Sequence, residues 1–409
     1  MKILQVGNID TVGGRFNGSK LSKQLRIVGI ESENCVFEKK TNDPNTYLLA
    51  NFWGYRKIWA ICYRLEKYFS LQSILYPFSF LLPLKKYFKN ADLIHYHLIH
   101  TGFFSLLSLP WLTHLKPTIW TLHDPWAMTG HCIYPYKCKN WATGCGECNN
   151  LSTPITMRRD NSRLMWKIKK WVYKNSKIDI VVASTWMYNM AKQSPLLENF
   201  NIHMIPFGID LSIYKPNNKT ESRNKFGIDQ NSFVVAFRSR DGEYKGLEYI
   251  KECLNKIKSN KNITILTVDQ TNQMEEFKNK FQVIEVDAGW GENDHIMADF
   301  YNACDIFLIP SIAEAFGLMA VEAMACGKPI LTFKDTSIEE VILAPLGGIA
   351  VPMRDSDALA IELQKIIDNP IIGKKIGEQA LKIAKENYNE NMYINRIINL
   401  YKEILLREK

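Results

Sequence analysis

Residues 313–329 read Ala-Glu-Ala-Phe-Gly-Leu-Met-Ala-Val-Glu-Ala-Met-Ala-Cys-Gly-Lys-Pro. The preceding segment 304–309 is apolar and ends at a Pro-Ser pair, which predicts a buried strand followed by a turn. Good helix formers follow Gly317, so the expected order is strand, loop and helix. From Leu318 onward the first helical N–H groups lack partners and carry roughly half a positive charge, which suits a phosphate.

Two glutamates flank this expected helix end. Glu314 lies in the loop, where its carboxylate can accept hydrogen bonds from hydroxyl groups. Glu322 lies one turn inside the helix, on the side of Leu318, and its two oxygens match the vicinal diol of a ribose. A phosphate between such carboxylates describes a nucleotide-sugar site. The alternative is a surface helix with two solvated glutamates, which the flanking Phe-Gly-Leu and Cys-Gly-Lys-Pro sequences disfavour.

The pattern resembles that of the family 4 retaining glycosyltransferases, in which Pro-Ser precedes Glu-x-Phe-Gly and then Glu-Ala-x-Ala-x-Gly-x-Pro. This chain fills the pattern without a gap, at Pro310, Ser311, Glu314, Phe316, Gly317, Glu322, Ala323, Ala325, Gly327 and Pro329. The resemblance implies an α/β protein of the GT-B fold, with two Rossmann-like, doubly wound parallel-sheet domains facing a cleft. The match is specific for the family and for no one sugar.

Length and pattern agree with two domains. The chain has 409 residues, 46% of them hydrophobic, which is enough for two cores. Buried strands alternating with helices predict parallel sheets. The expected strands are 2–7, 92–98, 117–122, 178–183, 202–205, 232–238, 262–267, 281–286, 304–309, 329–333 and 348–352, with early helices at 19–28 and 100–115. We expect an acceptor-binding domain at 1–213 and a nucleotide-sugar-binding domain at 214–388. A polar hinge is expected at 215–220, and a final helix at 389–409 is expected to cross back to the first domain.

The charge is unevenly distributed. Residues 1–200 hold 26 Lys and Arg against 12 Asp and Glu, and the whole chain has a formal net charge of +9. The basic half is expected to face an anionic partner: an acidic membrane surface, a lipid-linked pyrophosphate or nucleic acid. The first strand is too short for a signal peptide, and no apolar run reaches the roughly 18 residues of a membrane span. We therefore expect a cytoplasmic protein, peripheral on the inner face of the plasma membrane.

Cations for a diphosphate are expected after strand 232–238. Arg238 and Arg240 precede Lys245, and a glycine then opens a helix. The resembling family carries an arginine and a lysine here; Arg240 has the usual spacing, and Arg238 leaves the strand end where that arginine normally sits, so both remain candidates. Removing one cation that stabilises a leaving diphosphate typically slows the reaction about a hundred- to a thousandfold. A solvated basic loop is the alternative.

Further candidates lie in the first half. Gly13 and Gly14 form a glycine-rich turn between a strand and a helix, and in the resembling family paired glycines lie over the donor pyrophosphate and the acceptor. His123 follows a strand, where ligands collect in open parallel sheets, and family members carry a histidine near the donor's anomeric centre at this position. His95 and His97 fall on one face of a strand and are interpreted as core or acceptor-cleft residues rather than a metal cluster.

The segment 124–148 is rich in Trp, Tyr, Gly and Cys and predicts a long loop beside His123 that shapes the acceptor pocket. It resembles a loop of some exopolysaccharide-building family members. Its cysteines include only one pair at customary zinc spacing, so reduced thiols that pack the loop are favoured and a structural zinc site stays open. The four are Cys132, Cys138, Cys145 and Cys148.

Two stretches mix basic and aromatic residues, Phe52–Lys89 and Arg158–Lys174. An interfacial membrane helix has this composition, and so does a helix that buries its aromatic side chains and solvates its lysines. We expect membrane contact for the first stretch and the core arrangement for the second.

Together these features predict a metal-independent, retaining glycosyltransferase that needs no cofactor. It would transfer a hexosyl unit from a nucleoside diphosphate sugar to a growing, lipid-linked glycan in cell-surface polysaccharide biosynthesis, such as that of lipopolysaccharide. The resemblance assigns catalysis to His123, Glu314, Lys245 and Arg240. It assigns donor binding to Gly13, Gly14, Arg238, Arg240, Lys245, Glu314, Phe316, Gly317, Leu318 and Glu322.

Two details and two rival classes complete the expectations. An Asp-x-Asp at Asp355 and Asp357 lies at a helix start and is interpreted as a cap. Phe207-Gly208 stands where the family usually has Asn-Gly, so a hydrogen bond at the hinge between domains is missing. A nucleotide-sugar epimerase would need the same carboxylates and cations. A nucleic-acid-binding protein would gain nothing from the two glutamates, and no nucleic-acid partner is expected.

Overall fold

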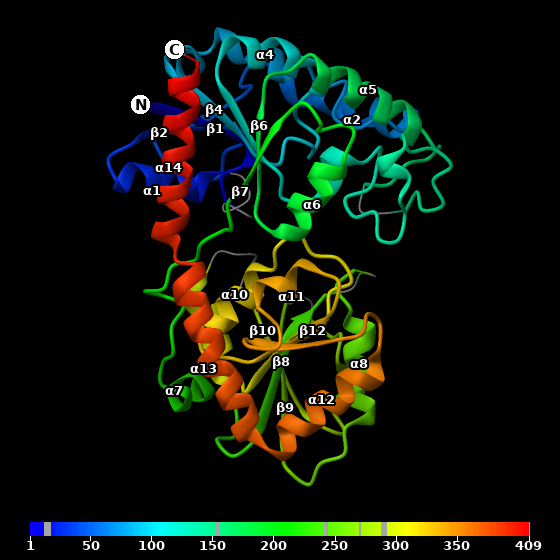
Figure 1. Ribbon diagram of the computed structural model, residues 1–409, viewed down its shortest axis with the longest axis vertical. Helices are drawn as coiled ribbons and strands as arrows, with labels where there is room; N and C mark the ends of the chain where they lie inside the picture. The colour runs from blue at the N-terminus through cyan, green and yellow to red at the C-terminus, as the bar shows by residue number, and fades with distance from the viewer. Residues whose placement is uncertain are drawn as a thin grey trace. The chain divides into compact units, whose positions relative to one another are not determined.

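The chain folds into two units, each built on one parallel sheet (Figure 1). The computed structural model describes residues 1–11, 18–152, 155–240, 242, 244–269, 271–287 and 293–408. One unit comprises Met1–Ile205 together with Ile394–Lys409, and the other comprises Pro206–Tyr393. The units thus divide several residues before the expected boundary at 213.

The first unit has a seven-stranded sheet in the order β3-β2-β1-β4-β5-β6-β7. Its strands are β1 (Lys2–Ile9), β2 (Glu31–Glu38), β3 (Thr46–Leu48), β4 (Leu93–Tyr96), β5 (Thr118–Thr121), β6 (Asp179–Val182) and β7 (Asn201–Met204). Its helices are α1 (Ser19–Ile27), α2 (Tyr55–Phe69), α3 (Lys86–Asn90), α4 (Leu109–Leu115), α5 (Ser162–Lys174), α6 (Thr185–Gln193) and most of α14 (Glu390–Arg407). Short 3-10 turns occupy Pro77–Leu84, Leu106–Ser108, Pro125–Met128 and Asn140–Ala142.

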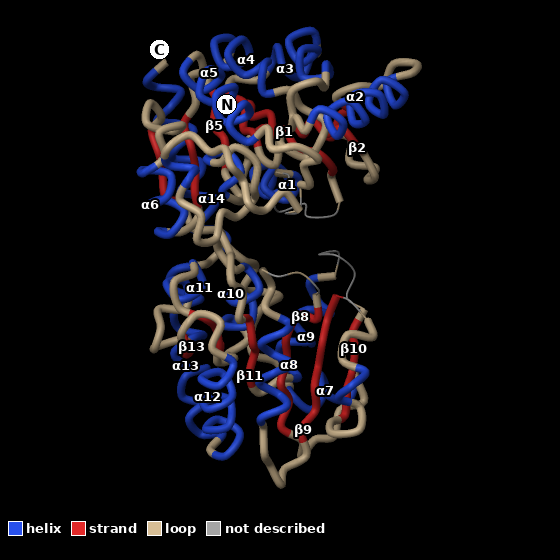
Figure 2. The backbone as a smooth tube through the Cα atoms, turned by 90° about the vertical axis from the view of Figure 1, so that its right-hand side faces the viewer, coloured by secondary structure: helices blue, strands red, loops and turns tan. Residues whose placement is uncertain are grey.

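The second unit has a six-stranded sheet in the order β10-β9-β8-β11-β12-β13. Figure 2 shows β10, β9, β8 and β11 of this sheet side by side. Its strands are β8 (Phe233–Ser239), β9 (Ile263–Asp269), β10 (Gln282–Val286), β11 (Ile306–Ile309), β12 (Ile330–Phe333) and β13 (Gly348–Val351). Its helices are α7 (Lys219–Lys225), α8 (Leu247–Lys256), α9 (Asp294–Ala303), α10 (Leu318–Ala325), α11 (Ser337–Val341), α12 (Ser356–Asp368) and α13 (Pro370–Asn387), with a 3-10 turn at Glu275–Phe277. α8 and α12 contribute to one buried cluster with the strands, through residues such as Ile250, Leu363 and Val235.

Every described strand pair within the two sheets is parallel. The fold class predicted from the sequence, two Rossmann-like parallel-sheet units of the GT-B type, is confirmed. The expected strands are present within a few residues of their ranges, but β2 and β3 were not predicted. Their sequences carry Glu, Asn and Asp close to the strand ends, which hides the apolar pattern.

Two local details differ from or add to the expectations. The helix expected over 100–115 begins at Leu109, because Pro110 occupies its first turn, where proline is tolerated, and the residues before it form turns. The polar hinge at 215–220 contains a helix start, since the Asn218 side chain accepts hydrogen bonds from the N–H groups of Thr220 and Glu221 and caps α7. The Gly13-Gly14 turn lies outside the described residues. Among described residues, no helix is long and apolar enough to cross a membrane.

Candidate active site

The strand order of the second unit reverses between β8 and β11. From β8 the chain winds outward to β9 and β10, returns to β11 and continues outward on the other side. Open parallel sheets bind ligands beyond the carboxyl ends of the strands at such a reversal. Lys245 follows β8 and Glu314 follows β11, so both side chains start at this point.

Lys245 and Glu314 form an ion pair at the reversal. The Lys245 ammonium donates to Oε2 of Glu314 over 2.7 Å, and the two side chains are only 16% and 18% exposed. The same ammonium lies 5.1 Å from the centroid of the Tyr244 ring, within reach of a cation–π attraction. The structure thus brings together a predicted cation and a predicted hydroxyl-binding carboxylate from segments 69 residues apart.

A close backbone contact fixes the two loops. The Ile312 N–H donates to the Tyr244 carbonyl over 2.9 Å. Gly246 has φ of 74°, and a Cβ atom there would stand 2.0 Å from the carbonyl oxygen of Pro310. Only glycine fits this position without movement of the backbone. Gly246 therefore sets the separation at which Lys245 can meet Glu314.

The helix end predicted to bind phosphate is present. Gly317 has φ of 93° and precedes α10, and its carbonyl accepts from the Ala320 N–H over 2.9 Å. Leu318 is the first residue of the helix, as expected. The Ser337 hydroxyl donates to the Glu314 carbonyl over 2.7 Å and holds the loop against α11. The positive end of α10 therefore lies directly after the Glu314 loop.

Phe316 is a packing residue of this loop. Its buried ring contacts the rings of Phe207 and Tyr388 edge to face, with centroids 5.3 Å and 5.7 Å away. Phe207, which replaces the usual asparagine of the resembling family, thus stabilises the loop by aromatic packing. The buried Ser311 hydroxyl has no hydrogen-bond partner among the described residues.

Glu322 is 5% exposed and accepts a hydrogen bond from the buried Tyr301 hydroxyl over 2.8 Å. Burial and the neighbouring Glu322 charge raise the pKa of Tyr301 well above its usual value, so its hydroxyl remains a donor. Tyr301 belongs to α9 and orients the carboxylate expected to bind a ribose. Tyr301 could not be predicted from the sequence, because a tyrosine on a helix is ordinarily a core residue.

The two candidate arginines share one carboxylate. Arg238 Nε donates to Asp269 Oδ2 over 2.6 Å, and a terminal nitrogen of Arg240 lies 3.8 Å from the same oxygen. Asp269 ends β9 with φ of 100°, which is unusual for a residue other than glycine. Asp269 was not predicted, and it places both guanidinium groups at the carboxyl end of the sheet.

The first unit holds a buried histidine network at its own reversal, between β1 and β4. His95, His97 and His123 stack in sequence, with ring centroids 4.3 Å and 5.7 Å apart. His97 Nδ1 lies 3.4 Å from His123 Nε2. Burial lowers the pKa of His95 and of His123 to about 3, and that of His97 well below its usual value, so all three rings are neutral.

The hydrogen bonds of this network fix the tautomers. The amide of Gln5 donates to the Tyr401 hydroxyl over 3.2 Å, while its oxygen faces His97 Nε2 at 2.8 Å and must accept from it. His97 Nδ1 is then an acceptor, so His123 carries its proton on Nε2. The Tyr401 hydroxyl also forms a hydrogen bond with His95 Nδ1 over 2.7 Å. Gln5 and Tyr401 of the C-terminal helix α14 therefore orient the ring that faces the predicted catalytic histidine, and the sequence did not indicate these contacts.

Hydrogen bonds and an ion pair hold the segment that follows His123. Asp124 accepts from the Trp126 N–H and pairs with His100 at 3.1 Å. The fully buried Lys169 donates to the carbonyls of Trp126 and Thr129 over 2.6 Å and 2.8 Å, and burial lowers its pKa to about 7. The interior Lys169 thus holds the first residues of the expected loop next to His123.

Comparison with known proteins agrees with this geometry. Residues 218–383 match the profile described as Glycosyl transferases group 1, and residues 23–213 match that of Glycosyltransferase Family 4. The chain belongs to the family 4 glycosyltransferases. The glycosyltransferase is 22% identical to D-inositol 3-phosphate glycosyltransferase 1 of Catenulispora acidiphila over half of each chain (50% and 52%). It is 24% identical to an uncharacterized glycosyltransferase of Methanocaldococcus jannaschii, over 69% of this chain and 73% of that one. It thus spans about half the length of several curated relatives it matches.

Solved structures show the same fold. Sucrose-phosphate synthase of Thermosynechococcus elongatus superposes with a TM-score of 0.69 at 16% identity over 100% of both chains. Anabaena HepE in complex with UDP and glucose gives 0.66 at 16% identity, over 98% of this chain and 99% of that one. WaaG, involved in lipopolysaccharide biosynthesis, gives 0.64 at 13% identity, over 97% and 99%. These likenesses establish the GT-B fold of the glycosyltransferase.

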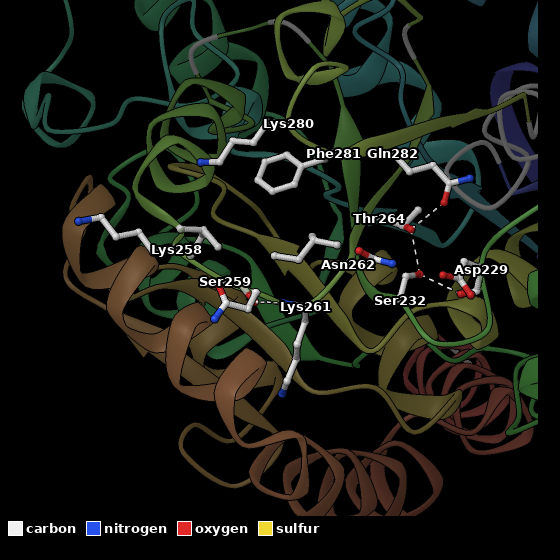
Figure 3. Close-up of a pocket in the computed structure, with 13 residues that line it drawn as sticks. Asp229, Ser232, Lys258, Ser259, Lys261, Asn262, Thr264, Lys280, Phe281 and Gln282 are labelled. Atoms are coloured by element: carbon white, nitrogen blue, oxygen red, sulfur yellow. Dashed lines mark hydrogen bonds between the residues drawn. The ribbon is translucent and has the colours of Figure 1, made fainter.

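Two features of the glycosyltransferase lie away from the Lys245–Glu314 pair and the His123 network. A cavity of about 610 Å³ opens at the amino-terminal ends of β8, β9 and β10, the sheet edge opposite to the Lys245 site (Figure 3). The Thr264 hydroxyl lies within hydrogen-bond distance of the Ser232 hydroxyl and of the Gln282 side-chain oxygen, at 2.9 Å and 3.0 Å. The Asp355 side chain accepts from the Ala358 N–H over 2.8 Å, which confirms it as the cap of α12.

The cysteines of the loop are free thiols in the structure. Cys145 Sγ accepts from the Gly130 N–H over 3.2 Å, and burial raises the pKa of Cys132 to about 12. Within the described part of the chain, no three His, Cys, Asp or Glu side chains are grouped to hold a metal ion. Cys132 and Cys145 therefore pack within the loop, whereas Cys138 is exposed.

Proposed function

We propose that this glycosyltransferase moves a hexosyl unit from a nucleoside diphosphate sugar to a growing, lipid-linked glycan, with retention of configuration and without a metal ion. The observation that carries the proposal is the Lys245–Glu314 pair, set at the sheet reversal directly before the positive end of α10. Cationic and hydroxyl-binding groups meet there in the way a sugar diphosphate requires.

Each group has a physical task in this proposal. Lys245 and Arg240, or Arg238, stabilise the negative charge that the leaving diphosphate gains as the glycosidic bond breaks. The first N–H groups of α10 bind the sugar or a phosphate oxygen, and Glu314 accepts from donor hydroxyls. Glu322, held by Tyr301, accepts both hydroxyls of the ribose. The acceptor attacks on the face that the leaving group vacates, and a donor phosphate oxygen takes its proton.

His123 acts in this proposal as a neutral, rigid contact near the anomeric centre. Its Nε2 proton is directed to His97, so its ring does not supply a positive charge. A neutral ring is compatible with an oxocarbenium-like transition state, which a cation beside it would destabilise. The network thus supports a positioning task for the ring together with its backbone carbonyl.

The lipid-linked acceptor and the cell-surface pathway are proposed from the charge distribution. Residues 1–200, which hold the large excess of Lys and Arg, form most of the first unit, to which His123 belongs. A lipid-linked pyrophosphate carries the complementary charge. We place the reaction at the cytoplasmic face of the membrane, where such acceptors are built.

A donor panel tests the proposal. Thermal-shift measurements with UDP-, GDP- and dTDP-sugars should identify one donor. With that donor, the enzyme should transfer the sugar to lipid-linked glycans extracted from membranes. NMR of the product should show the same anomeric configuration as in the donor. Lys245→Ala should slow transfer about a hundred- to a thousandfold. The matched control is Lys251→Ala, since Lys251 lies on α8 and pairs with Glu276 at 3.0 Å at the surface.

Three results would contradict the proposal. Equal rates of transfer by Lys245→Ala and Lys251→Ala would show that Lys245 does not belong to the active site. Release of nucleoside diphosphate with an epimerised sugar in the absence of any acceptor would indicate an epimerase. Loss of transfer in a chelator, restored by a divalent ion, would show that the reaction needs a metal.

A further inference from the structure

Helix α2 presents an apolar stripe to solvent. Its buried residues are Cys62 and Glu66, and Figure 2 shows the helix at the periphery of the first unit. Ile58, Ile61, Leu65 and Tyr68 follow one another at three- and four-residue steps, which places them on one side of a helix. All four are exposed, as is Phe69 at the helix end, and Ile61 reaches 56%.

Two exposed aromatic residues stand shortly before α2. Trp53 is 92% exposed, and Phe52 beside it is also exposed. A tryptophan costs more to keep in water than almost any other side chain, because its apolar area is large. An ordinary surface helix directs such residues into the core. The stripe with Trp53 therefore has the composition of a surface that is covered in the working protein.

The same helix is strongly basic on its outer side. Arg56, Lys57, Arg64 and Lys67 are all exposed. The single acid within α2 is Glu66, whose buried carboxylate accepts from the N–H groups of Ser73, Ile74 and Leu75 over 3.0, 2.6 and 2.8 Å. The outer surface of α2 therefore combines cations with apolar side chains and carries no acidic group of its own.

The inner side of α2 is firmly attached. Besides the three bonds to Glu66, the Trp59 indole donates to the Gly102 carbonyl over 2.7 Å. At the end of the helix, the Asn161 side chain donates to the Phe69 carbonyl over 2.5 Å, which joins α2 to the segment before α5. The stripe is thus held in place by the fold and does not need to order when a partner arrives.

We propose that α2 and Trp53 dock on an anionic lipid bilayer, with the stripe inserted among the acyl chains and the cations among the headgroups. This deepens the proposed function, because it names the surface by which the enzyme reaches a lipid-linked acceptor. The basic and apolar side chains of α2 favour a lipid bilayer over the other possible partners. Two copies facing each other through α2 would bring like charges together, and a nucleic acid would leave the aliphatic stripe in water.

The α5 helix gives a partial contrast. Trp166 is buried there, as the core interpretation of that stretch expected, whereas Trp171 is exposed and departs from it.

Vesicle co-sedimentation of the full chain without any sugar donor tests docking, so that failure to dock and failure to transfer sugar are separate results. Binding to vesicles of phosphatidylglycerol and phosphatidylcholine should be at least tenfold tighter than to phosphatidylcholine alone. Ile61→Ser with Leu65→Ser should weaken binding at least tenfold at low and high salt. Arg64→Gln with Lys67→Gln should reduce the preference for anionic vesicles, since salt-screened attraction is removed.

The matched control is Ile361→Ser with Ile371→Ser, two exposed isoleucines of the second unit. It should bind as the unaltered chain does, and all variants should keep the melting temperature because the positions face solvent. Equal binding by the α2 variant and this control, or no binding by the unaltered chain, would overturn the proposal. So would dimerisation of the unaltered chain, by sedimentation velocity, that the α2 variant abolishes.

Discussion

Mild acid should destabilise the first unit selectively. His95, His97 and His123 are buried and neutral. Burial lowers the pKa of His95 and of His123 to about 3, and it lowers the pKa of His97 well below its usual value. In the unfolded chain each titrates near 6.5. Between these values the unfolded state binds more protons, so stability is present above pH 6.5 and is lost as pH falls.

The size of the effect follows from linkage. Lowering the pH from 7.0 to 5.5 costs about 1.2 kcal/mol for each histidine that protonates only when unfolded, or roughly 4 kcal/mol for the three. Burial also lowers the pKa of His131, which adds to the loss. Burial raises the pKa of Glu66, which acts in the opposite direction and offsets a part. Since domains have about 5–15 kcal/mol of stability, the loss is large.

Tryptophan fluorescence isolates this unit, because nine of the ten tryptophans precede residue 206. Urea unfolding at pH 7.0, 6.5, 6.0 and 5.5 should show a falling free energy of unfolding for the fluorescence transition. His95→Gln removes one titrating ring and should reduce the pH-dependent loss by about a third. A free energy that changes by less than about 1 kcal/mol over this range would refute the neutral, buried state of the network.

Three further outcomes are expected in the second unit. Glu322→Gln keeps an acceptor for Tyr301 but loses the charge, so it should weaken binding of the preferred nucleoside diphosphate about tenfold by calorimetry, with Tyr301→Phe giving a smaller loss. Asp269→Asn should raise the KM for the donor more than it lowers kcat, because it releases an arginine rather than removing it; an unchanged KM would contradict this. Gly246→Ala should destabilise by at least about 2 kcal/mol more than Gly227→Ala in thermal unfolding, since both have positive φ but nothing lies within 4 Å of Gly227.

The strands that could be predicted from the sequence are those made of an uninterrupted apolar segment. β8 and β11 are continuous apolar runs bounded by polar residues, so their positions and their parallel pairing followed from the pattern. β2 was missed because its Glu31, Glu33 and Glu38 interrupt the pattern, with Ser32 and Asn34 buried among them. Burial of those polar residues depends on neighbours that only the tertiary structure supplies.

The site was predictable to the same extent. Glu314, Lys245 and the start of α10 could be placed because each stands at the end of an expected strand or helix. Asp269 and Tyr401 could not, since their tasks depend on partners 31 and 306 residues away in sequence. A residue that acts by holding another residue leaves no local pattern, and its task appears only when the fold places the two together.

The two units hold their polar groups in opposite ways. In the second unit each candidate cation already has a carboxylate partner, as in Lys245 with Glu314 and Arg238 with Asp269. A diphosphate can replace these carboxylates as the partner of the cations, so the cations are paired both before and after the donor binds. The His123 network contains no such ion pair between its members, and its neutral rings keep their geometry only while they stay unprotonated. Donor binding should therefore respond mainly to ionic strength, and the first unit mainly to pH, which separates the two contributions in a single set of kinetic measurements.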